Sequence, residues 1–175
     1  MTTLRDRLHA LGRIARHRWL DAGDSHRALG DDGLQRLQAM VAASESTHSG
    51  EIRICVEAGL PLSYLWRGAT VRERAVTMFG KLRVWDTEHN NGVLIYLLLA
   101  DRRIEIVTDR GLNAHVSAGQ WQALTASMAE AFQAGRFTEG LGQAVGEVHR
   151  LLARHFPVGP GEANANELPD AVVVR

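Results

Sequence analysis

Helical spacing of apolar residues dominates the first fifty positions of the chain. Residues 4–19 place a leucine and isoleucine stripe among arginines, which predicts a basic amphipathic helix that either docks on the domain or lies on an anionic membrane or partner. A second stripe predicts a helix with Asp31 or Asp32 as its N-cap and an end near Gly50. The two stripes are Leu4, Leu8, Leu11 and Ile14, followed by Leu34, Leu37, Met40 and Val41.

Strand patterns begin at residue 51. Residues 51–58 alternate apolar and polar side chains, which predicts a strand with one face toward a core. Residues 59–68 have no period and are interpreted as a loop, and a Thr70/Glu73 capping box then predicts a helix to about Leu82. The apolar run 92–100 is typical of a strand covered on both faces, and residues 104–109 return after a short turn. The order predicts a right-handed parallel βαβ unit followed by an antiparallel hairpin.

Two further helices complete the predicted domain. Ser117 and Gln120 form a capping box for a helix that ends near Gly135, and a second helix ends before Pro157. The Pro, Gly and Asn-rich residues 157–175 are interpreted as an extended or disordered tail. We therefore divide the chain into an N-terminal helix and linker over residues 1–29, an α/β domain over residues 30–156, and the tail.

Charge, the length of the apolar run and the cysteine count argue against several classes of function. The formal net charge of +0 and the pI near 7.1 give no global electrostatic reason to expect a nucleic-acid partner. The apolar run 92–100 is about half of the roughly 20 residues that a membrane-spanning helix requires. We see no secretory signal and expect a cytoplasmic protein that is either free or peripheral to a membrane. The single cysteine, Cys55, is interpreted as a buried structural thiol rather than a nucleophile.

Three dipeptides around the hairpin carry a resemblance to a known family. They are Asn91–Gly92 before the apolar strand, Asp101–Arg102 in the turn, and Gly111–Leu112 after the returning strand. With the order of elements over roughly residues 30–156, they resemble the TPM domain family, which includes thylakoid-lumen acid-phosphatase-like and many bacterial proteins. The resemblance implies a three-layer αβα sandwich with a small mixed central sheet. It also implies calcium binding, acid phosphatase activity, or an accessory role in membrane-associated assemblies.

Oxygen-bearing side chains gather at both ends of the predicted hairpin. About eight residues of strand separate these ends by some 25 Å, so the two groups cannot share one ion. The first group suits a hard cation such as Ca²⁺ or Mg²⁺, although its members are equally turn formers and a solvated loop. The second group lies where open α/β sheets bind ligands. The first candidate metal site is Asp86, Glu88, Asn91 and Asp109, and the second candidate site is Glu57 and Asp101.

Two functional hypotheses follow. The first is a non-catalytic binding or accessory module that holds a cation and contacts a protein partner, one that is itself membrane-associated. The second is a weak metal-assisted acid phosphatase, for which no catalytic residue can be named and no organic cofactor is expected. The apolar loop 59–68 is the candidate partner surface, with the alternative that it covers an edge of the sheet. Its candidate contact residues are Leu62, Tyr64, Leu65 and Trp66.

Overall fold

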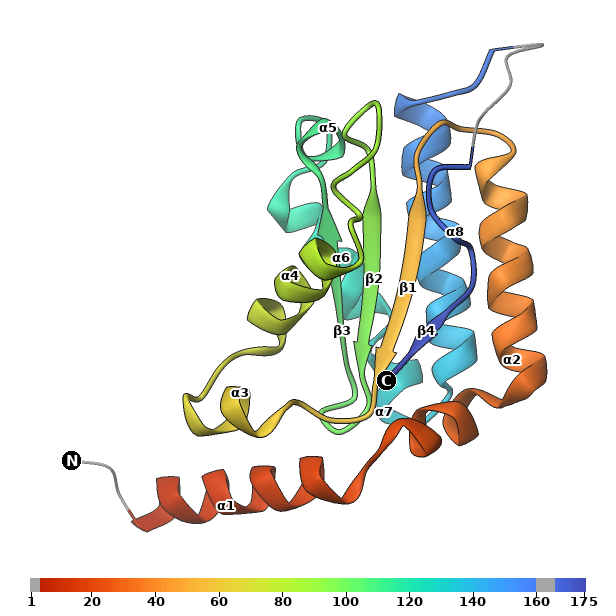
Figure 1. The fold of residues 1–175 in the computed structure, drawn as a ribbon. Helices are drawn as coiled ribbons and strands as arrows, with labels where there is room; N and C mark the ends of the chain where they lie inside the picture. The colour runs from red at the N-terminus through yellow and green to blue at the C-terminus, as the bar shows by residue number, and fades with distance from the viewer. Residues whose placement is uncertain (1–3, 160–165) are drawn as a thin grey trace.

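A small mixed sheet forms the centre of the molecule (Figure 1). The computed structural model describes residues 4–159 and 166–175, with side chains described from residue 12 onward. The sheet has the strand order β3-β2-β1-β4. Its strands are β1 (Ile52–Glu57), β2 (Val93–Leu98), β3 (Arg103–Thr108) and β4 (Val173–Val174).

The register of the strands confirms the predicted βαβ unit and hairpin. β1 runs parallel to β2, with Ile52 opposite Val93, and the crossover between them contains α3 (Leu62–Trp66) and α4 (Val71–Lys81). The capping box that begins α4 has the predicted reciprocal bonds between Thr70 and Glu73. β2 and β3 pair antiparallel, and β4 adds to the free side of β1 in parallel orientation.

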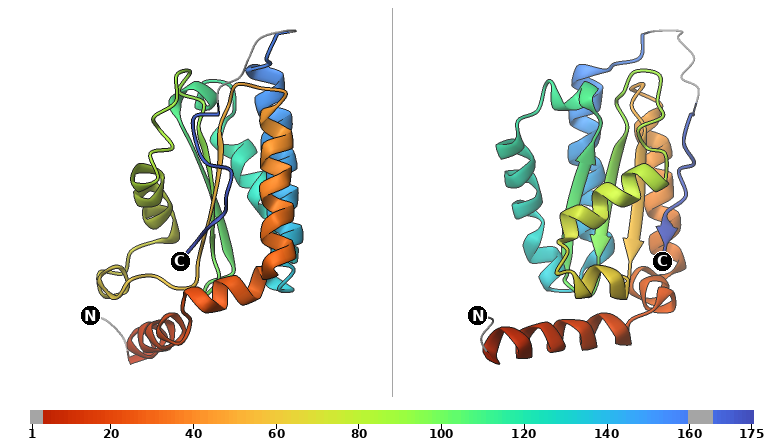
Figure 2. Two further views of the ribbon diagram at one scale, coloured as in Figure 1. Left: turned by 45° about the vertical axis from the view of Figure 1, so that its right-hand side comes forward. Right: turned by 60° about the vertical axis from the view of Figure 1, so that its left-hand side comes forward.

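Helices cover both faces of this sheet (Figure 2). α4 lies on one face, and α2 (Ala22–Glu45) packs beside α8 (Phe137–His155) on the other. α6 (Ala118–Ser127) and α7 (Ala129–Gln133) lie on the same side as α8, near β3. The three-layer αβα sandwich with a mixed sheet is therefore confirmed. α1 (Leu4–Trp19) crosses the end of the sandwich, and none of the described helices combines the length and apolarity needed to span a bilayer.

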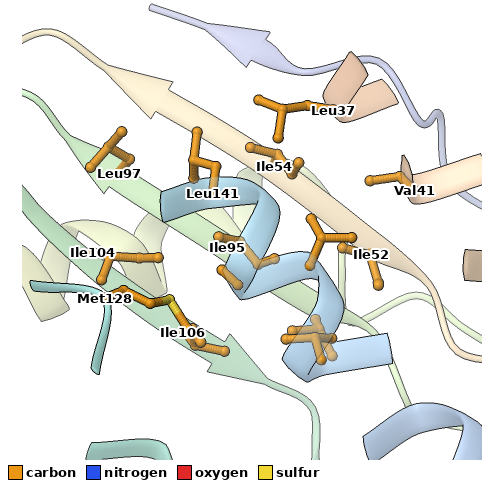
Figure 3. Close-up of a cluster of buried hydrophobic side chains, with 14 of the residues drawn as sticks. Leu37, Val41, Ile52, Ile54, Ile95, Leu97, Ile104, Ile106, Met128 and Leu141 are labelled. Carbon is orange, nitrogen blue, oxygen red and sulfur yellow. The ribbon is translucent and has the colours of Figure 1, made fainter. Parts of the chain in front are cut away.

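Two apolar clusters hold the layers together. The larger one lies between the sheet and α2, α7 and α8, and Figure 3 shows its side chains meeting across that interface. The smaller one lies between the sheet and α4. The larger cluster includes Leu37, Val41, Ile52, Ile54, Ile95, Leu97, Ile104, Ile106, Met128 and Leu141. The completely buried β2 separates the two clusters, as its uninterrupted apolar run predicts.

The observed bounds of several helices differ from those predicted. α2 begins at Ala22 with Asp21 as its N-cap, and it passes through a non-helical Gly30 (φ 66°) instead of starting at Asp31 or Asp32. The segment interpreted as a loop contains the short helix α3. The predicted helix to Gly135 is divided at Met128 into α6 and α7, and α5 (Arg110–Asn113) was not predicted. The leucines that the stripe of α1 predicts lie outside the described side chains, whereas Ile14 packs on the smaller cluster.

The second face of β1 is also buried, although the alternation predicted only one face toward a core, because α4 covers this side of the sheet. The buried thiol of Cys55 is confirmed, and Glu57 is buried with it. Burial of Cys55 raises the pKa of its thiol to about 12, which leaves it protonated and poorly nucleophilic. The C-terminal residues 173–174 form β4, so part of the segment interpreted as a tail belongs to the sheet.

Candidate functional site

The end of the sheet where β2 begins and β3 finishes brings the first candidate group together. Val93 pairs with Thr108, and the Asp109 amide donates to the Gly92 carbonyl at 3.0 Å. The Gly111 amide donates to the Asn90 carbonyl at 2.9 Å. These bonds fasten the Asn-Gly dipeptide against the start of α5, so Asn91 and Asp109 lie at the same end of the hairpin.

Asn91 and Asp109 each hold one buried oxygen without a hydrogen-bond partner among the described residues: Asn91 Oδ1 and Asp109 Oδ2. Asn91 is completely buried, and its Nδ2 donates to Ser49 Oγ at 3.2 Å. Asp109 Oδ1 accepts from the Arg110 amide at 2.7 Å and caps α5. A buried acceptor left unsatisfied costs about 1–3 kcal/mol, so each of these oxygens is a place where water or a cation would bind.

The other two candidate metal ligands are exposed, and the carboxylate of Asp86 is already paired. Asp86 Oδ2 pairs with the Arg83 guanidinium at 2.6 Å, and the Glu88 amide donates to the Glu167 carboxylate at 3.0 Å. Neither carboxylate makes a hydrogen bond or an ion pair with Asn91 or Asp109 within the described part of the chain. Over the same residues, no three His, Cys, Asp or Glu side chains gather closely enough to share a metal ion. The unpartnered oxygens of Asn91 and Asp109 are an amide and a carboxylate oxygen, which are donor types that suit a hard cation.

Glu57 belongs to a buried ion pair. Its carboxylate accepts from Arg74 Nε at 2.8 Å and from Arg74 NH2 at 2.5 Å, and the Tyr96 hydroxyl donates to it at 2.6 Å. Hydrogen bonding to Glu57 raises the pKa of Arg74, while burial, followed by the charge of Glu57, raises the pKa of Tyr96. All three side chains are nearly inaccessible, so Glu57 joins α4 to the sheet.

Asp101, the partner of Glu57 in the second candidate site, fastens α1 instead. Its Oδ1 lies 3.1 Å from His17 Nε2, and its Oδ2 lies 3.5 Å from Arg13 NH2. His17 Nδ1 accepts from the Leu60 amide at 3.0 Å, so the proton of this imidazole is on Nε2 and points at Asp101. The hydrogen bond from His17 is the largest cause that lowers the pKa of Asp101. Glu57 and Asp101 thus have different partners, and no contact joins them in the described residues.

The four candidate contact residues on α3 differ in exposure. Leu62 is 40% exposed and Trp66 is 76% exposed, whereas Leu65 is buried in the smaller cluster. Tyr64 is partly buried; its hydroxyl donates to Thr77 Oγ1 at 2.9 Å, and the Arg67 guanidinium lies 4.5 Å from its ring centroid. Leu62 and Trp66 therefore carry the apolar surface that this segment presents to solvent.

A buried polar cluster between α2, α8 and the start of β1 was not predicted. Ser44 Oγ lies 2.7 Å from His48 Nε2 and 3.1 Å from His149 Nδ1. Burial, the largest cause, lowers the pKa of His48 to about 4. Beside it, Glu45 Oε1 accepts from the Ile52 amide at 2.8 Å. The only sequence signal was the i, i+4 spacing of Ser44 and His48 at the end of a helix, which does not reveal burial.

Glu45 is expected to make the stability depend on pH. Burial, the largest cause, raises its pKa from 4.5 to about 8, so the folded protein keeps a proton that the unfolded chain loses in this range. The free energy of unfolding should therefore fall as pH rises through this window, by up to about 1.4 kcal/mol per pH unit. His48 has the opposite effect only below its ordinary pKa of 6.5, so the fall from Glu45 is clearest between pH 6.5 and 8.

Urea unfolding of Glu45→Gln measures this dependence. The variant should lose most of the fall between pH 6.5 and 8, whereas Glu130→Gln, at an exposed position on α7, should keep it. An unchanged slope in Glu45→Gln would show that this carboxyl is ionised in the folded protein.

Comparison with known proteins assigns the family. The family model described as the TPM domain matches residues 23–151, well over half of the chain. The fold is similar to the BA42 protein from the psychrophilic bacterium Bizionia argentinensis, with a TM-score of 0.71 and 28% identity over 83% of this chain and 94% of that one. It is also similar to the N-terminal domain of a protein from P. gingivalis, with a TM-score of 0.61 and 21% identity over 78% of this chain and 90% of that one. None of the curated proteins compared with the chain matches it. The match over residues 23–151 confirms the resemblance, and this chain belongs to the TPM domain family.

Proposed function

We propose that this chain is a non-catalytic binding module that holds a divalent cation, Ca²⁺ or Mg²⁺, where Asn91 and Asp109 meet. The observation that carries the proposal is the pair of buried acceptor oxygens, Asn91 Oδ1 and Asp109 Oδ2, that lack a partner among the described residues. Both are ligand types that Ca²⁺ accepts. Glu88, on the exposed segment that leads into Asn91, is a further carboxylate for the same ion, and Asp86 would have to leave Arg83 to join it.

The donor set favours a weak site that is completed by water. Ca²⁺ takes about 6–8 oxygen ligands, and Asp109 Oδ1 is already used to cap α5. Asp109 would therefore bind through Oδ2 and Asn91 through its amide oxygen. Nearby backbone carbonyls are additional donors, because the carbonyls of His89 and Asn90 both lie close to Gly111. A hydrated site of this kind serves ligand or partner recognition better than permanent structural binding.

A protein partner, itself associated with a membrane, is the second part of the proposal. Trp66 and Leu62 support it, since both are exposed on one short helix at the end of the molecule that α1 also occupies. Aromatic side chains of this kind are the usual anchors of protein interfaces.

Weak metal-assisted phosphomonoester hydrolysis is the second candidate function. Arg110 favours it: its guanidinium lies beside the proposed cation, bonded to Asn90 Oδ1 at 3.0 Å and 2.7 Å. A cation with an adjacent arginine could bind a phosphate and orient water. We rank it second because the neighbouring described side chains supply no activated nucleophile.

A Ca²⁺ titration of the ¹⁵N-labelled protein followed by NMR tests the binding function. Amide shifts should concentrate on residues 86–91 and 109, and Asp109→Asn should weaken binding by roughly tenfold, because the charge of the ligands sets the affinity. Asparagine still caps α5, so the variant should stay folded. Asp32→Asn, on the exposed surface of α2, is the matched control.

Two outcomes would change the assignment. Shifts centred on Glu57 and Asp101 would place the cation at the opposite end of the sheet. Cation-dependent hydrolysis of p-nitrophenyl phosphate that Asp109→Asn abolishes in a folded protein would make the phosphatase the first candidate.

A further inference from the structure

β3 is the outer strand of the sheet, and one row of its backbone groups points away from β2. The bond from the Asp109 amide to the Gly92 carbonyl fixes which row this is. Residues two apart share a direction in an antiparallel ladder, so Val107, Glu105 and Arg103 bond toward β2. The backbone groups of Ile104, Ile106 and Thr108 therefore face outward, where no strand of the described sheet pairs with them.

A cleft of about 580 Å³ runs along this edge. Ile104, Ile106 and Thr108 line one side of it, and Ser117, Trp121 and Thr125 of α6 line the other. α6 stands beside β3 at the margin of the sandwich, and none of its residues is fully buried (Figure 2). The helix thus forms one wall of an open groove, and the volume lies within the range of pockets that hold ligands.

The hydrogen-bonding groups of the cleft decide which atoms of an extended backbone it can bind. The Trp121 indole Nε1 is buried and has no acceptor among the described residues. The outward carbonyl of Ile106 accepts from Arg72 NH1 at 2.5 Å, and that of Thr108 accepts from Asn113 Nδ2 at 3.0 Å. Side chains therefore occupy two of the outward carbonyls, whereas the outward N–H groups and the indole N–H remain to be paired with acceptors.

Charged side chains at the rim of the cleft favour a negatively charged ligand. Arg72 and Arg103 both lie near Glu105, at 3.8 Å and 3.5 Å, so this part of the rim carries two cations and one anion. The guanidinium of Arg72 is also half-exposed and can leave the Ile106 carbonyl for an incoming carboxylate. An acidic side chain would be favoured here over a basic one.

We propose that the cleft between β3 and α6 binds an extended, acidic segment of a partner protein, which pairs with β3 as an additional strand. Main-chain bonds from the outward N–H groups of Ile104, Ile106 and Thr108 would supply affinity, and the indole N–H of Trp121 would donate to one peptide carbonyl. The proposal does not rest on the cation site, and its tests are carried out in EDTA.

Selection of peptides from a phage-displayed library of random 12-residue sequences tests this surface. Selected peptides should be acidic with alternating apolar residues, and should shift the amides of Ile104, Ile106 and Thr108 and the indole of Trp121. Thr108→Pro removes one outward N–H without touching the ladder to β2, and should weaken binding at least tenfold. Thr108→Val loses the same hydroxyl but keeps the N–H, and should bind like the unmodified protein.

Trp121→Phe keeps the ring and removes the indole N–H, so it should weaken the same peptides several-fold even if Thr108→Pro does not fold. Equal binding to Thr108→Pro and Thr108→Val, shifts away from β3, or no selected peptide would overturn the proposal. Shifts of the β3 amides that grow with protein concentration in the absence of peptide would also overturn it, because the occupant would then be a second copy of this chain.

Discussion

Replacing Gly92 by alanine is expected to destabilise the protein by about 3 kcal/mol or more, at the upper end of the cost of overpacking. A Cβ atom at this position would lie 1.9 Å from the Val84 carbonyl oxygen. That oxygen belongs to backbone between α4 and β2, and neither side can move without disturbing the hydrogen bond from Asp109 to the Gly92 carbonyl. The glycine of the Asn91–Gly92 dipeptide is thus required by close backbone packing.

Gly80 provides the matched control for Gly92→Ala. It lies within α4, and a Cβ atom there would meet nothing within 4 Å. Gly80→Ala should stabilise the protein by about 0.5–1 kcal/mol, because alanine loses less conformational freedom in a helix. Urea unfolding of both variants compares the free energies directly. Equal midpoints for the two would contradict the close approach at Gly92.

Removing the side chain of Arg74 is expected to cost about 3–5 kcal/mol of the free energy of unfolding. Arg74 and Glu57 are 4% and 5% exposed, so Arg74→Ala would leave a buried carboxylate with Tyr96 as its remaining hydrogen-bond donor. The desolvation of an unpaired charge is the reason for the large loss. Loss of the bond between α4 and β1 should accompany it, measured as faster hydrogen exchange of the α4 amides.

Arg150 on α8 provides the control for Arg74. Its ion pair with Glu147 is at the surface, with the arginine side chain 68% exposed. Arg150→Ala should therefore change the stability by no more than about 0.5 kcal/mol. A loss below about 1 kcal/mol in Arg74→Ala would indicate that water reaches Glu57 and solvates it.

Elements with strong local signals were predictable. The Thr70/Glu73 capping box located the start of α4, because its reciprocal bonds join residues only three positions apart. The apolar run before Asp101 identified β2, and the short turn after it identified the hairpin, because both signals lie within a few consecutive residues. The start of α2 was predicted about ten residues too late: Asp21 and Asp24 form a capping box that begins it, and the helix continues beyond a non-helical Gly30.

For the candidate site, the sequence predicted which end of the hairpin carries the residues but not the contacts of their side chains. Antiparallel pairing required Asn91 and Asp109 to lie at the same end of the hairpin, since a short turn fixes its register. The pattern could not show that Asp86 pairs with Arg83, nor that an oxygen of Asn91 is buried with no partner among the described residues. Those facts depend on how the loop before β2 folds over the end of the sheet.

The sequence by itself determined the βαβ unit and the hairpin, because periodicity, capping and turns act over a few residues. Its resemblance to the TPM domain family implied the layer architecture. Only the tertiary structure decided that Glu57 is an internal ion-pair partner, that Asp101 holds His17 of α1, and that β4 joins β1. Each of these contacts joins segments that are distant in the chain. A charged residue at a strand end has the same local pattern whether it faces water or a buried arginine, and only the packing of α4 against the sheet distinguishes the two.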